Sequence, residues 1–132
     1  MFEGEYLNGK RKGKGKEYYN DKLIFDGEYY NEKRNGKGRE YFENYDILFE
    51  GEYLNGKRWN GKGYNLKKET VFEIKNGNGK GKEYYWNGEL KFEGEYLNGE
   101  KYKGKEYNEY GELMLEREYL NGERNGKGKE YN

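Results

Sequence analysis

One short phrase recurs along this chain and constrains the fold more than any other feature. Its typical order is an aromatic residue, an acidic residue, glycine, glutamate and tyrosine, followed by Asn-Gly, basic residues, Gly-Lys-Gly and Glu-Tyr. The phrase returns every 20 to 24 residues, a period typical of solenoids and repeat arrays. We therefore interpret residues 1–132 as a single array of six units: 2–24, 25–48, 49–71, 72–91, 92–114 and 115–132.

Within a unit, the residues alternate with a period of two. Phe25, Gly27 and Tyr29 take one parity, whereas Asp26 and Glu28 take the other. This alternation indicates β-strands, and no stripe of helical period is visible. The Asn-Gly pairs favour tight hairpin turns, because both central residues of such a turn need positive φ. Each unit is therefore predicted to be one β-hairpin.

The hairpins are expected to join edge to edge, because an isolated two-stranded hairpin is only marginally stable in water. Glycines between and opposite the rings leave bare backbone on which those rings can lie, as Gly4 does between Phe2 and Tyr6. On the opposite face, Glu and Lys are expected to form cross-strand ion pairs of about 0.2–1 kcal/mol each. The predicted fold is all-β: an elongated, single-layer antiparallel sheet of about six consecutive hairpins.

Composition supports this array over a compact globule. The hydrophobic fraction is only 31%, and aromatic residues alone make up 19% of the chain. Few aliphatic residues remain to fill a large core. Disordered chains are poor in aromatic residues, so the aromatic content favours an ordered structure.

The phrase in residues 2–27 resembles a MORN repeat (membrane occupation and recognition nexus). That family's pattern is an aromatic residue, any residue, glycine, any residue and an aromatic residue, followed by a turn and a Gly-x-Gly strand. The resemblance recurs over essentially the whole chain. It implies an elongated sheet of consecutive hairpins, a non-catalytic scaffolding or self-associating role and, in some members, contact with acidic phospholipids. The matching positions are Phe2, Gly4, Tyr6, Gly9, Gly13 and Gly15, and again Phe49, Gly51, Tyr53 and Gly56.

Some units depart from the pattern. Ile74 and Arg117 occupy glycine positions, Trp59 is an insertion, and the unit 72–91 is short. We expect a kink or a change of twist around residues 66–82. Neither end carries an evident polar cap, so the ends are expected either to pair with another copy or to continue into further repeats.

An enzymatic function has little support in the sequence. The chain has no His, Cys or Ser, so it lacks the ordinary nucleophile–base pairs. A pair of catalytic carboxylates is formally possible, but glutamates in register with lysines favour ion pairing. Residues 56–62 have P-loop spacing, yet Gly63 replaces the required hydroxyl residue. We predict no enzyme, no catalytic, metal or cofactor-binding residue, and no small-molecule substrate.

Two surfaces are candidates for function. A one-layer sheet is not expected to cover its own aromatic face, which makes that face the candidate protein-docking surface. Basic residues at the hairpin tips are expected to line one edge, where each contributes about 1 kcal/mol near an anionic membrane. The structural alternative is that they are solvated and discourage aggregation. The candidate docking residues are Phe2, Tyr6, Phe25, Tyr29, Phe49, Tyr53, Phe92, Tyr96 and Tyr119, and the candidate lipid-contact residues are Lys10, Arg11, Lys33, Arg34, Lys57, Arg58 and Arg124.

The sequence thus favours a non-catalytic scaffold for protein–protein interaction or self-association. Peripheral binding to anionic phospholipid membranes is the alternative. Nucleic acid is not an expected partner, because 26 basic residues are balanced by 26 acidic ones. No long apolar run and no signal-peptide pattern occurs, so we expect a cytoplasmic protein, with a position at the membrane or cytoskeleton left open.

Overall fold

The computed structural model describes residues 1–120, 123–124 and 129–130, with side chains described for residues 1–116. The described residues form β-strands joined by turns and contain no helix. The strands are β1 (Phe2–Leu7), β2 (Lys10–Tyr19), β3 (Lys22–Tyr30), β4 (Lys33–Tyr41), β5 (Ile47–Leu54), β6 (Lys57–Tyr64), β7 (Thr70–Lys75), β8 (Asn78–Tyr84), β9 (Leu90–Leu97), β10 (Glu100–Tyr107), β11 (Leu113–Leu120), β12 (Glu123–Arg124) and β13 (Lys129–Glu130).

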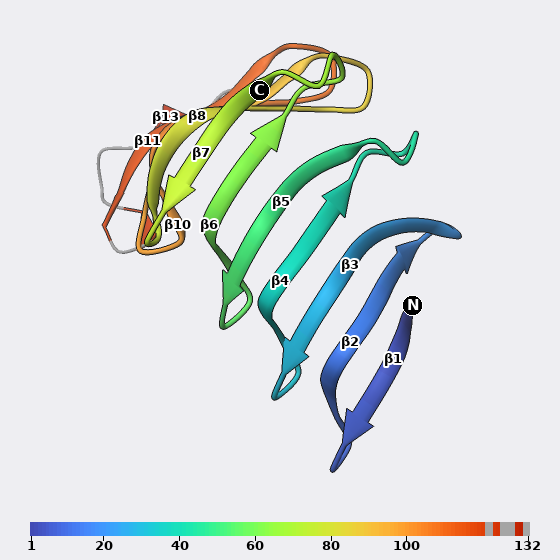
Figure 1. Ribbon diagram of the computed structural model, residues 1–132. Helices are drawn as coiled ribbons and strands as arrows, with labels where there is room; N and C mark the ends of the chain where they lie inside the picture. The colour runs from blue at the N-terminus through green and yellow to red at the C-terminus, as the bar shows by residue number, and fades with distance from the viewer. Residues whose placement is uncertain (121–122, 125–128, 131–132) are drawn as a thin grey trace.

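Strands that follow one another in the sequence are neighbours in one sheet (Figure 1). The order runs from β1 to β12, and β13 also pairs with β11. Every described pairing is antiparallel. The sheet is open at β1, whose outer edge pairs with no described strand. The predicted all-β sheet of consecutive hairpins is therefore confirmed.

Glycines face one another across the strands, as in the pairs Gly27–Gly38 and Gly38–Gly51. These positions have no room for a side chain. A Cβ added to Gly38 would lie 2.6 Å from the Phe25 ring, and one added to Gly51 would lie 1.9 Å from the Asn60 carbonyl oxygen. The rings therefore rest on bare backbone, as the sequence predicted.

The aromatic rings form a continuous row through the sheet. Phe2 contacts Tyr29 with ring centroids 4.9 Å apart, and Phe25 contacts Tyr53 at 5.2 Å, both nearly edge to face. Edge-to-face pairs of this kind add about 0.5–1.5 kcal/mol to the free energy gained from burial. Since each contact joins neighbouring hairpins, the row binds the units of the array together.

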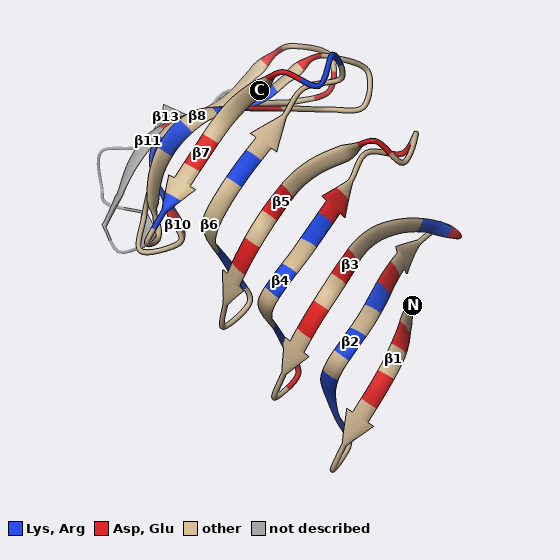
Figure 2. Ribbon diagram, in the orientation of Figure 1, with Lys and Arg blue, Asp and Glu red and all other residues tan. Residues whose placement is uncertain are grey.

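The opposite face carries alternating charge, with acidic side chains on odd-numbered strands and basic side chains on even-numbered strands (Figure 2). Asp26 lies opposite Lys16 on one side and Arg39 on the other, which confirms the expected register. Close ion pairs of this face include Arg39–Glu50, with Nε and Oε2 3.2 Å apart. Both side chains are more than two-fifths exposed, so such a pair contributes little to stability.

The fourth hairpin differs from its neighbours. A β-bulge interrupts the β1–β2, β3–β4, β5–β6 and β9–β10 hairpins, whereas β7 and β8 pair without a shift of register. Bulges bend and twist a strand. The fourth hairpin is thus shorter and unbulged, and the kink or change of twist expected around residues 66–82 stays a prediction.

Candidate functional site

The aromatic face that the sequence analysis took for a docking surface is the interior of the protein. Phe25, Tyr29, Phe49, Tyr53 and Phe92 are only 0–4% exposed. A protein partner cannot contact these rings, so the expectation of an uncovered aromatic face is wrong for them.

The remaining candidates for docking differ among themselves. Phe2 and Tyr96 are partly buried and pack against the core, whereas Tyr6 is 58% exposed. The side chain of Tyr119 lies outside the described residues. Of the candidates with described side chains, Tyr6 alone is largely accessible.

Basic side chains from the hairpin tips cover the rings. The Arg11, Arg34 and Arg58 guanidinium carbons lie 4.5, 4.0 and 4.6 Å from the ring centroids of the first phenylalanine of their own units. Lys101 lies 4.7 Å from the Phe92 ring centroid in the same way. A cation over an aromatic ring is stabilising, and the apolar stem excludes water from the ring. This cover explains how a single sheet buries its own aromatic face.

The predicted row of basic tips is consequently incomplete. Arg34 and Arg58 turn toward the rings and are 24% and 14% exposed, so assigning them to lipid contact is wrong. Arg11 pairs with Glu32 and Lys57 with Glu100, at 3.1 and 2.5 Å between nitrogen and oxygen. The other candidates are Lys10 and Lys33, which are exposed, and Arg124, whose side chain lies outside the described residues.

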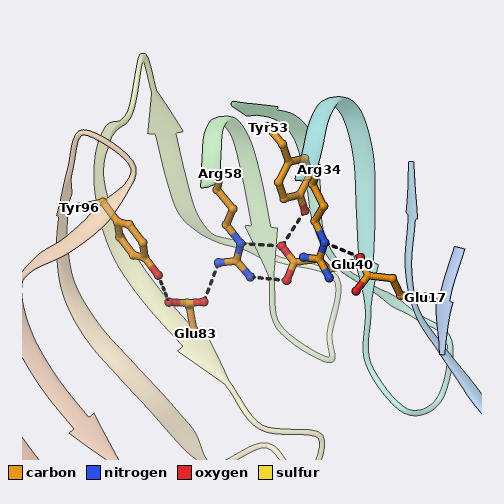
Figure 3. A network of polar contacts seen from close by, with 7 residues as sticks. All are labelled: Glu17, Arg34, Glu40, Tyr53, Arg58, Glu83 and Tyr96. Atoms are coloured by element: carbon orange, nitrogen blue, oxygen red, sulfur yellow. Dashed lines mark hydrogen bonds and ion pairs between the residues drawn. The ribbon is translucent and has the colours of Figure 1, made fainter. Parts of the chain in front are cut away.

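The inward-turned arginines belong to a buried polar network (Figure 3). Arg58 binds both oxygens of Glu40, through Nε at 2.7 Å and Nη2 at 3.0 Å, and its Nη1 donates to Glu83 at 2.6 Å. The Tyr53 hydroxyl donates to Glu40 at 2.6 Å, and the Tyr96 hydroxyl donates to Glu83 at 2.9 Å. The same arrangement appears one unit earlier, where Glu17 accepts from Arg34 and Tyr29.

In most of these contacts, a tyrosine and an arginine of one unit bind a glutamate on the second strand of the preceding unit, and the Arg58–Glu83 contact is the exception. Gly63 takes the glutamate position of the third unit, since it lies opposite Phe49 and Phe72. The third unit thus has no glutamate at this position, and Arg58 extends to Glu83 of the next unit. The Arg58–Glu83 contact thus joins the third and fourth units of the array.

Counting across the Asn-Gly turns would have located this network. Residues opposite each other in an antiparallel pair share a face. In the third hairpin, Tyr53 pairs with Arg58, and Leu54 pairs with Lys57. Likewise Glu40 pairs with Phe49. The second basic residue of each pair therefore lies on the aromatic face, and only the first points away from it.

The electrostatics favour a charged, structural network. Burial alone raises the pKa of the Glu40 carboxyl, but the Arg58 charge and the hydrogen bonds from Arg58 and Tyr53 outweigh it and hold the pKa below its usual value. Burial and the Glu40 charge raise the pKa of the Tyr53 hydroxyl. The pKa of Arg58 is raised because Glu40 and Glu83 outweigh its burial. Glu40 and Arg58 therefore stay ionised while Tyr53 stays neutral.

The contacts of this network join neighbouring hairpins and are suited to stabilise the sheet. Its carboxylates are held by arginine, so they are poorly suited to accept or donate a proton during a reaction. No group of three acidic side chains suitable for a metal ion occurs among the described residues. The part of the chain with described structure also has no helix able to cross a membrane.

A hollow lies on the charged face, over β2 to β5. It has a volume of about 580 Å³ and is lined by both acidic and basic side chains, including Lys14, Glu28, Lys37 and Glu52. Because the two signs of charge alternate along it, this hollow favours neither anions nor cations.

Exposed apolar side chains gather instead on the two long margins of the sheet, which the sequence analysis did not identify. Tyr19, Tyr45, Trp86 and Tyr110 are 54–79% exposed at the turns that link successive hairpins. Leu7, Tyr30 and Leu54 are 41–67% exposed beside the hairpin tips. The aromatic residue beside each linking turn was the available signal for the first row.

Comparison with known proteins agrees with the repeat architecture. The family model described as MORN repeat matches residues 2–23, 25–47 and 118–131. No curated protein matches this chain. The first matched segment covers the hairpin β1–β2 and the turn after it, and the second covers most of β3, all of β4 and the turn after it. This chain carries MORN repeats, and its sheet of consecutive hairpins is a MORN-repeat array.

Proposed function

We propose that this chain is a non-catalytic repeat scaffold that associates with protein, including further copies of itself. The observation that carries this proposal is the distribution of exposed apolar side chains. They lie in rows along the margins of the sheet, while the face with the most aromatic residues is filled by its own arginines. Extended apolar rows are suited to contact another macromolecule, whereas small ligands bind in concave pockets.

Light scattering over a series of protein concentrations tests self-association. We expect the weight-average mass to rise with concentration at physiological salt. A mass that stays at 15.9 kDa, the value for one chain, would contradict self-association and leave association with other proteins as the remaining form of the proposal. Exposed apolar side chains next to charged ones make such an interface sensitive to point substitution.

Peripheral binding to anionic membranes is the second candidate. In its favour, Lys10, Lys33 and Lys57 lie at the hairpin tips beside Leu7 and Leu54. Lysines near an anionic surface contribute about 1 kcal/mol each, and neighbouring apolar side chains add to this by burial.

Other features of the tips weaken the membrane candidate. Glu32 and Glu100 bring negative charge to the same margin and pair with Arg11 and Lys57. The withdrawal of Arg34 and Arg58 toward the rings removes further positive charge from the tips.

Sedimentation with vesicles that contain acidic lipid separates the two candidates. Salt-sensitive pelleting that is lost on changing Lys10, Lys33 and Lys57 to Glu would favour the membrane. The matched control changes the exposed Lys14, Lys37 and Lys80 of the charged face to Glu, with the same change in net charge. Equal loss in both variants would indicate an unspecific charge effect, and absence of pelleting supports the protein scaffold. Arg34 and Arg58 should be left intact, because replacing them is expected to disturb the fold.

A further inference from the structure

The first hairpin lacks a partner that the interior hairpins possess. The ten residues 2–11 and 49–58 have the same sequence, FEGEYLNGKR. Tyr53 in the interior copy is 4% exposed and donates to Glu40 of the preceding hairpin. Tyr6, its counterpart, is 58% exposed, and its hydroxyl makes no hydrogen bond with a described residue. The site around Tyr6 is therefore incomplete.

The arginines of the two copies differ in the same way. Arg58 binds Glu40 on the preceding hairpin through two nitrogens. Arg11 has no preceding hairpin among the described residues and pairs instead with Glu32 of the following one. What β1 lacks is a neighbouring strand that ends in a glutamate.

The interior of the sheet shows what such a strand must look like. β2 precedes β3 with Gly15 opposite Gly27 and Glu17 opposite Phe25. β8 precedes β9 in the same register, with Gly81 opposite Gly94. Both preceding strands contain the sequence GKGKE, in residues 13–17 and 79–83. If a GKGKE strand paired with β1, the glycine of β1 would lie opposite a glycine. The acidic residues of β1 would lie opposite lysines, and its phenylalanine would lie opposite the glutamate.

The chain contains this sequence once more, in residues 126–130. Of these residues, β13 (Lys129–Glu130) pairs with β11 on one side and with no described strand on the other. Its register is the interior one, because Glu130 lies opposite Leu115 as Glu17 lies opposite Phe2. The outer edge of β13 thus matches the open edge of β1.

We propose that the open edge of β1 pairs with the β13 strand of a second copy, so that copies join head to tail. This places Glu130 of one copy opposite Phe2 of the next, the register position from which Glu17 and Glu40 bind the tyrosine and arginine of interior hairpins. Since β1 and β13 each have an outer edge that pairs with no described strand, the same contact repeated from copy to copy would build an open chain. The proposal rests on the proposed self-association and gives it a specific interface.

Engineered cysteines test the pairing directly, because the chain contains none of its own. By the interior register, Glu3 of one copy lies opposite Lys129 of the next, as Asp26 lies opposite Lys16. Opposite residues have Cβ atoms about 4.5–5.5 Å apart, close to disulfide range. E3C and K129C are made in separate chains that differ in mass, mixed and oxidised. Circular dichroism first verifies that both variants fold.

We expect the mixed E3C–K129C dimer to form at least about tenfold faster than in a control mixture of D21C and K129C, because Asp21 lies in an exposed turn and belongs to no strand that would pair with β13. A predominant E3C–E3C dimer would show that two β1 edges pair with each other and would overturn the proposal. A mixed dimer formed no faster than in the control would also overturn it.

A charge reversal gives a second readout. R11E is expected to raise the concentration needed for association by about tenfold or more, because a glutamate replaces the cation that would face Glu130. The matched control is R39E, on the exposed charged face, which should change the concentration needed for association little. If light scattering shows association without the mixed cross-link, the head-to-tail interface fails and the scaffold proposal stands. If the mass stays that of one chain, self-association fails as well.

Discussion

The two copies of FEGEYLNGKR, residues 2–11 in the first hairpin and 49–58 in the third, are a natural comparison within one molecule. Phe49 is fully buried while Phe2 is only partly so, and Arg58 is 14% exposed while Arg11 is 32% exposed. Ten identical residues thus reach different environments. Burial in this protein therefore depends on a hairpin's place in the array, because the glutamate bound by the tyrosine and the arginine comes from the hairpin before it.

The largest expected effect follows from removing the buried ring. Phe49→Ala should lower the free energy of unfolding by about 3–5 kcal/mol, because it leaves a cavity between two hairpins and uncovers the stem of Arg58. Phe2→Ala, in the same sequence context, should cost less than half as much. Urea denaturation followed by circular dichroism measures both. Equal losses would contradict the idea that position in the array sets burial.

Removing the arginine should have an effect of similar or slightly smaller size. Arg58→Ala leaves Glu40 and Glu83 with uncompensated charges at 17% and 12% exposure, and breaking a buried pair in this way costs about 3–5 kcal/mol. Arg11→Ala removes one partly exposed ion pair with Glu32 and should cost about 0–1 kcal/mol. The difference between the two losses, from the same denaturation series, is the quantity to compare. A difference near zero would mean that the interior network adds no stability.

Acid should destabilise the same network less than Arg58→Ala does. Protonation removes the negative charge of Glu40 but leaves its carboxyl group in place. The pKa of Glu40 is below its ordinary value of 4.5, so its contribution to stability is present above that pH and is lost as the pH falls through the lower, folded-state pKa. The urea midpoint should therefore fall steadily below about pH 4.5. Glu40→Gln should flatten this fall. An unchanged slope in that variant would show that other carboxylates cause it.

The smallest expected effect concerns a single hydroxyl. Tyr53→Phe removes the hydrogen bond to Glu40 and should cost about 1–3 kcal/mol, because the acceptor is charged and poorly solvated. Tyr6→Phe removes a hydroxyl with no partner among the described residues and should leave stability unchanged within about 0.5 kcal/mol. A measurable cost at Tyr6 under associating conditions would instead indicate a partner for that hydroxyl in the assembly.

Much of the fold could be predicted because the contacts that define it are local. A two-residue Asn-Gly turn fixes the register of a hairpin, and glycine opposite glycine follows from that register. The candidate surfaces were harder to predict from the sequence. Lys57 and Arg58 look like one basic tip in the sequence, although adjacent residues of a strand point to opposite faces. Arg58 therefore lies over the Phe49 ring, and an expectation of exposure built on the whole pair was wrong for half of it.

The repeating unit of this protein can be predicted from the amino-acid sequence alone: it is a hairpin with rings and glycines on one face and opposed charges on the other. This is possible because the residues that make a hairpin are close together in the chain and repeat. The contacts between units, in contrast, are visible only in the folded sheet. Arg58 extends to Glu83 because Gly63 stands where a glutamate would have ended the third unit, and Tyr6 is exposed because no described strand precedes β1. The environment of a residue in a stacked array comes from the neighbouring unit, so it cannot be predicted from the sequence of one unit alone.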